Sequence, residues 1–162
     1  MKPKIQIERR MFYLLIILLS ISNILLIFWL LDGLILGTTA FDNFLENERI
    51  TAINNFIILR YAGYISNSIL LIAFLVNILT SKKQGVGYLF GIIWIILFIG
   101  ILLVPYFSSG SLTENWIRLT IVIIWSFVFP LLIICIVKIM FNLRIKRQNY
   151  YYEKIKFYKG GK

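Results

Sequence analysis

The chain has 162 residues, of which 60% are hydrophobic and only 15% are charged, and its formal net charge is +10. A soluble domain is typically about 45–50% apolar and about 25% charged, so this chain has too little polar surface to cover a globule in water. Histidine is absent and Cys135 is the single cysteine, which excludes intramolecular disulfides, thiol redox pairs and histidine-ligated metals. The composition predicts an all-α integral membrane protein with no cofactor and no metal site.

Hydrophobic segments long enough to cross a bilayer occur four times along the chain. A transmembrane helix needs about 20 mostly apolar residues, and the segments that meet this requirement are 11–36, 55–80, 87–105 and 116–141. The first is longer than the roughly 7–15 apolar residues of a signal peptide, so we expect it to be a membrane anchor. Because the connections are short, the sequence predicts a single four-helix transmembrane domain over residues 1–162, ending in a basic tail over 142–162.

The distribution of lysine and arginine predicts the orientation of these segments. The regions before the first segment, between the second and third, and after the fourth, together with Lys138 at the end of the fourth, hold 14 of the 17 basic residues and two of the seven acidic ones. Cytoplasmic loops carry an excess of basic residues. We therefore expect a multi-pass protein of the cell membrane with both termini in the cytoplasm.

The basic tail mixes its cations with aromatic residues, namely Tyr150, Tyr151, Tyr152, Phe157 and Tyr158. Aromatic rings of this kind sit well at the headgroup level, and each basic residue near an anionic surface contributes about 1 kcal/mol. We expect the tail to contact anionic lipid; the alternative is a topology signal with no further role. Because the basic residues are divided among segments beside the spans, no nucleic-acid partner is expected.

Two charged residues lie where the first and second segments meet the outer interface. Asp32 closes the first segment, and Arg60 opens the second at the same depth. In an antiparallel hairpin this arrangement predicts an ion pair between them at the outer rim. The alternative is that each side chain reaches headgroups or water by itself, the arginine by extending its long stem.

Polar residues also lie deeper in the first two segments. Asn23 and Asn67 have similar depths, and Tyr64 shares a helix face with Asn67 and Arg60. The pattern predicts intramembrane polar contacts that hold the two helices together. A polar lining for a solute or ion path is the alternative, but such a path usually has a charged residue near the midplane, and the sequence places none there.

Three local features bear on helix packing and shape. Gly87 and Gly91 form a GxxxG pattern, which favours close helix packing either within the bundle or against a second chain. Pro130 removes one backbone hydrogen bond from the fourth segment and predicts a kink there. Between the first two segments, a capping-box-like start at Thr39 predicts a short helix on the outer interface.

These observations favour a non-enzymatic function. General acid–base catalysis most often uses histidine, which is absent, and the sequence contains neither a nucleophile elbow nor a P-loop. We expect an accessory or structural subunit of a larger membrane protein complex, surrounded by the lipid bilayer and binding other integral membrane proteins. The alternatives are a small oligomeric channel or transporter, and an immunity or partner-masking membrane protein.

Overall fold

The computed structural model describes residues 6–35, 41–42, 45–107 and 116–160. Its principal elements are the α-helices α1 (Arg9–Ile35), α2 (Glu46–Gln84), α3 (Tyr88–Phe107) and α4 (Trp116–Gly160). Each of these helices is long and apolar enough to cross a membrane. The prediction of an all-helical chain with four helices of membrane-spanning length is therefore confirmed.

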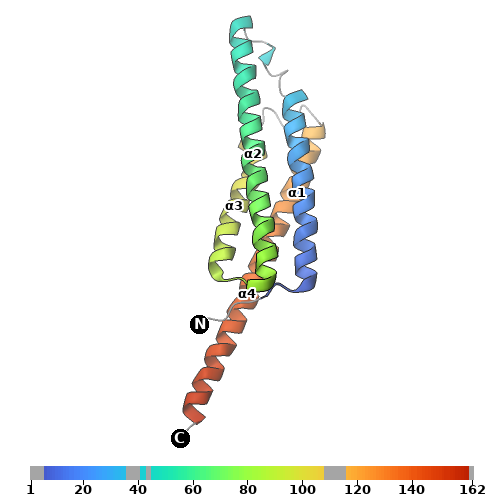
Figure 1. The fold of residues 1–162 in the computed structure, drawn as a ribbon. Coiled ribbons are helices and arrows are strands. Elements are labelled where there is room, and N and C mark those ends of the chain that lie inside the picture. The colour runs from blue at the N-terminus through green and yellow to red at the C-terminus, as the bar shows by residue number, and fades with distance from the viewer. Residues whose placement is uncertain (1–5, 36–40, 43–44, 108–115, 161–162) are drawn as a thin grey trace.

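The four helices run alternately up and down and form a bundle (Figure 1). Helix α4 packs along both α1 and α3, α1 also packs along α2, and α2 meets α3 over a shorter stretch. We call the end where α1 begins and α4 leaves the bundle the tail end, and the end where α1 stops and α4 begins the head end. This order of contacts places α4 beside α1, although these helices are farthest apart in the sequence.

Two helices are longer than the sequence predicted. Helix α2 begins at Glu46, before the predicted start of the second segment at residue 55, so Glu46 and Glu48 lie in its first turn. Acidic residues in the first turn interact favourably with the helix dipole, which supports this early start. Helix α4 continues without interruption through the basic tail to Gly160. The predicted capping residue Thr39 lies outside the described residues.

The interior of the bundle is filled by aromatic side chains where α2, α3 and α4 meet. The Phe74 ring centroid lies 4.8 Å from that of Trp94 and 4.7 Å from that of Phe98. On α4, the rings of Trp125 and Phe129 are 4.8 Å apart, and Phe129 lies 6.1 Å from Phe98. These separations fall in the favourable range for aromatic pairs. The rings therefore close the space between the three helices.

A cross-helix hydrogen bond follows from the proline in α3. Pro105 lies inside this helix, which continues to Phe107 instead of ending at the proline as predicted. A proline has no backbone N–H, so the carbonyl of Ile101, four residues earlier, loses its helical donor. The indole Nε1 of Trp125 donates to that oxygen at 3.2 Å. The proline thus exposes an acceptor that links α3 to α4.

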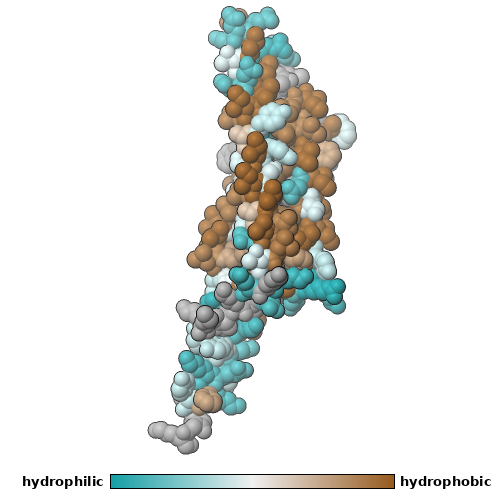
Figure 2. Space-filling view, in the orientation of Figure 1, coloured by the Kyte–Doolittle hydropathy of each residue, from teal (hydrophilic) through white to brown (hydrophobic). Residues whose placement is uncertain are grey.

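The surface shows a hydrophobic band between two polar ends. In Figure 2 apolar residues cover most of the middle of the visible face, whereas polar residues gather at the head end and along the projecting part of α4. A surface of this kind is typical of a protein whose middle is surrounded by lipid.

Candidate functional site

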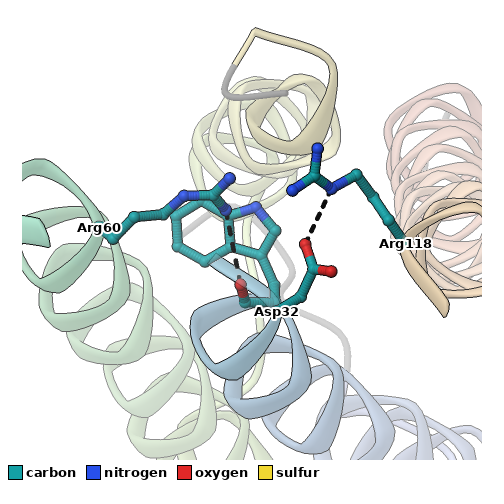
Figure 3. Close-up of polar contacts among 4 residues, drawn as sticks. Asp32, Arg60 and Arg118 are labelled. Carbon is teal, nitrogen blue, oxygen red and sulfur yellow. Dashed lines mark hydrogen bonds and ion pairs between the residues drawn. The ribbon is translucent and has the colours of Figure 1, made fainter. Parts of the chain in front are cut away.

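A cluster of buried charged residues lies at the head end of the bundle. Asp32 comes from α1, Arg60 from α2 and Arg118 from α4 (Figure 3). Only 6% of the surface of Asp32 and 3% of that of Arg60 is exposed. Burying a charge costs much free energy unless the charge is paired. Charged residues buried in an otherwise apolar bundle are therefore the strongest candidates for a functional site.

Asp32 forms an ion pair with Arg118 across α1 and α4. The Nε atom of Arg118 donates to Oδ2 of Asp32 at 2.9 Å, and the two side chains are 14% and 3% exposed. Charge-assisted hydrogen bonds are roughly twice as strong as neutral ones, and the low dielectric of a buried site strengthens them further. The other carboxylate oxygen of Asp32, Oδ1, is also buried and accepts no hydrogen bond within the part of the chain that the structure describes.

Arg60 lies beside this pair, held between aromatic rings. Its guanidinium carbon is 4.4 Å from the centroid of Trp29 and 5.0 Å from that of Phe56. Its Nη1 also donates to the backbone oxygen of Trp29 at 3.5 Å. The side chain of Arg60 packs against α1 at Gly33. A Cβ atom at Gly33 would lie 2.7 Å from Nε of Arg60, so a larger residue there would displace the arginine. Cation–π contacts of this kind stabilise a desolvated guanidinium by about 2 kcal/mol.

The three charged residues surround a cavity that is small. Its volume is about 10 Å³, and its remaining walls come from Trp29, Pro105, Ile121 and Val122. A water molecule needs about 10–15 Å³ of such volume, so the cavity has room for one water molecule and for no larger solute. The ion pair of Asp32 and Arg118 links α1 to α4 at the head end, beside this cavity of water size.

The sequence predicted Asp32 and Arg60 as a pair and did not select Arg118. The structure brings Asp32 and Arg60 into the same cluster, and the ion pair that it describes for Asp32 goes to Arg118. A direct pair between Asp32 and Arg60 stays a prediction. The signal for Arg118 was its position in the first turn of the fourth segment, which places it at the same level as the other two residues.

The polar residues predicted to connect the first two helices bond within their own helices. Nδ2 of Asn23 donates to the oxygen of Leu19 at 2.9 Å, and Nδ2 of Asn67 donates to the oxygen of Gly63 at 2.7 Å. Asn67 is buried, Asn23 is half-buried, and Tyr64 packs against the hydrophobic core. A polar contact between α1 and α2 at this depth remains a prediction.

We expect Asn67→Leu to lower the free energy of unfolding by about 0.6 kcal/mol, because hydrogen bonds inside membrane bundles are weak. Unfolding of the purified protein by SDS in mixed micelles measures the change. Asn77→Leu is the matched control, since Asn77 is exposed on the same helix, and we expect it to have no destabilising effect. A much larger loss for Asn67→Leu would mean that its amide bridges two helices.

The two glycines of the GxxxG pattern have different surroundings. A Cβ atom at Gly91 would overlap the side chain of Met140 on α4, whereas one at Gly87 would meet nothing within 4 Å. Gly91 therefore permits the close approach of α3 and α4, and Gly87 does not take part in it. Pro130 lies inside α4, which continues past it; the predicted kink stays a prediction.

Within the described ranges, no group of three or more acidic, histidine or cysteine side chains is placed to hold a metal ion. The fold and the cluster define an all-helical bundle with four helices of membrane-spanning length and a buried ion pair at one end. No protein family, no curated protein and no solved structure matches this chain.

Proposed function

We propose that the bundle is inserted in the cell membrane with its tail end, and hence both termini, in the cytoplasm. Charged residues mark two levels along the helices: Arg10 and Lys82 at the tail end, Asp32 and Arg60 at the head end. At about 1.5 Å per residue the two levels lie roughly 33 Å apart, close to the hydrocarbon thickness of about 30 Å. The basic residues of the tail end support the cytoplasmic assignment.

Cysteine labelling on intact cells tests this orientation. In a Cys135→Ala background, we expect a membrane-impermeant thiol reagent to label Thr51→Cys, which lies on α2 beyond the head-end level. The same reagent should not label Gln148→Cys on the projecting part of α4 until the cells are opened. Both positions are exposed, so a reversed pattern would contradict the orientation and could not be attributed to burial.

We propose that the chain acts as a non-enzymatic accessory subunit that binds another membrane protein at the head end. The observation that carries this proposal is the projecting start of α2, which extends past the end of α1 (Figure 1). Leu45, which immediately precedes α2, is 75% exposed, and Ile50 in its second turn is 56% exposed. Counted from Arg60 at about 1.5 Å per residue, these side chains lie roughly 15–22 Å beyond the charged level, past a headgroup region of about 5–8 Å.

Lipid therefore does not cover these two apolar side chains, and a protein surface is the partner that fits them. Large apolar side chains exposed at the level of the hydrocarbon, such as Ile69 and Ile96, give no comparable argument, because lipid satisfies them equally well. An immunity or partner-masking protein would use the same projecting surface. In the described part of the chain, aromatic rings from α2, α3 and α4 pack against one another inside the bundle, which disfavours a channel formed by one chain.

The test is whether a complex depends on this surface. After gentle solubilisation from native membranes, we expect the chain to migrate with a second membrane protein that mass spectrometry identifies, and Leu45→Ser with Ile50→Ser to release it. Ile155→Ser is the control, since Ile155 is exposed at the opposite end of the molecule. A homo-oligomer that carries solute flux in liposomes would overturn the proposal and favour the channel.

A further inference from the structure

A second hollow lies at the tail end, between the residues that precede α1 and the part of α4 that leaves the bundle. Its volume is about 410 Å³, and α1 closes it at Met11. This groove is large enough for a small polar group, in contrast to the cavity at the head end. Its lining divides into an apolar half and a polar half, and each half limits what fits there.

The apolar half lies against the hydrophobic core of the bundle. Ile7 and Ile139 form its floor and are 7% and 5% exposed, and Met11 packs against the same core. This part of the groove lies where α1 begins and where the apolar part of α4 ends. In the proposed insertion this is the boundary between hydrocarbon and headgroups of the cytoplasmic leaflet.

The polar half comes mainly from one face of α4. Asn142, Lys146 and Asn149 line the groove, and their spacing of four and three residues places them on the same side of a helix. They offer one ammonium group and two amides as hydrogen-bond donors. Gln6 and Glu8 line the groove from the opposite side and supply acceptors.

The charge around the groove favours an anion. Lys146 lies in the lining, and Arg9 and Arg10 directly follow Glu8 at the start of α1, whereas Glu8 is the one acidic residue among the lining residues that the structure describes. A phosphodiester next to Lys146 gains from this excess of positive charge. An ammonium headgroup could approach Glu8 but would be repelled by Lys146 in the lining and by Arg9 and Arg10 beside Glu8.

We propose that this groove binds one phospholipid of the cytoplasmic leaflet with an anionic phosphoglycerol headgroup. Lys146 pairs with the phosphate, the amides of Asn142 and Asn149 donate to its oxygens, and Glu8 and Gln6 accept from the glycerol hydroxyls. The start of an acyl chain lies on Ile7 and Ile139, which is why a lipid fits better than free phosphate. The proposal rests on the proposed membrane insertion and gives the expected contact of the tail with anionic lipid a defined site.

Native mass spectrometry of the full, delipidated chain in detergent tests the site. We expect phosphatidylglycerol to bind with a stoichiometry of one. Phosphatidylethanolamine keeps the phosphate but lacks the glycerol hydroxyl that donates to the Glu8 carboxylate, so we expect it to bind about tenfold more weakly, which corresponds to one lost charge-assisted hydrogen bond. Lys146→Gln should weaken the phosphatidylglycerol complex by about the same factor. Lys156→Gln makes the same charge change on α4 away from the groove and should leave binding unchanged.

Equal binding by Lys146→Gln and Lys156→Gln would overturn the site, as would equal binding of the two lipids or full competition by inorganic phosphate. Met11→Trp supplies a second variant, because the larger ring should fill the groove and block the lipid while Lys146 remains. This binding is measured on the isolated chain, so it does not depend on a protein partner. Leu45→Ser with Ile50→Ser should keep the lipid, which separates failure of this site from failure of the proposed head-end interface.

Discussion

Asp32→Asn is expected to lower the free energy of unfolding by about 3–5 kcal/mol, the cost of breaking a buried ion pair by removing one partner. The side chain of Asp32 is only 3% exposed, and its carboxylate is paired with Arg118. Its loss leaves the buried guanidiniums of Arg60 and Arg118 close together without a compensating negative charge. SDS unfolding in mixed micelles, followed by tryptophan fluorescence, measures the change.

The pair of Asp42 and Arg49 supplies the matched control for this result. Its atoms approach to 2.6 Å, but its side chains are 55% and 43% exposed. Exposed pairs contribute about 0–1 kcal/mol, so Asp42→Asn should have little effect. If Asp32→Asn and Asp42→Asn were equally mild, the head-end cluster would not join the helices.

Gly91→Leu is expected to lower the free energy of unfolding by about 1–3 kcal/mol, the usual cost of overpacking. Any side chain at this position would overlap the side chain of Met140, so Met140 must change its conformation or α3 and α4 must move apart. The same unfolding assay applies. Gly87→Leu is the control. A Cβ atom at Gly87 would meet nothing within 4 Å, so this variant should leave the free energy of unfolding almost unchanged.

A double variant distinguishes this contact from a general effect of bulk. Combining Gly91→Leu with Met140→Ala should recover part of the lost stability, because residues in contact show coupling energies and distant ones do not. Strict additivity of the two changes would show that Gly91 and Met140 do not meet. If Gly91→Leu and Gly87→Leu lowered the free energy of unfolding equally, the loss would come from placing a leucine near the start of α3 and not from the contact with Met140.

The sequence predicted the number of helices and the approximate place of each because a membrane-spanning helix needs an unbroken apolar stretch. It did not predict where α2 begins or α4 ends, since Glu46 and Gly160 lie in polar segments where hydropathy carries no information about helix formation. Intrinsic helix propensity, the remaining signal, is weak and easily overridden. Both proposed binding surfaces lie on or beside these polar extensions, with Leu45 and Ile50 at the start of α2 and Lys146 on the projecting part of α4.

The sequence by itself determined four apolar helices of membrane-spanning length, a basic tail end, and Asp32 and Arg60 at one common level. Only the tertiary structure decided that Asp32 forms an ion pair with Arg118, which lies 86 residues away on α4. Short connections identify α2 as a neighbour of α1, but they do not show that α4 packs against the other side of α1. The physical reason is that lipid is as apolar as leucine. Hydropathy therefore identifies which segments can be helices in a membrane, whereas packing alone determines which of their faces meet.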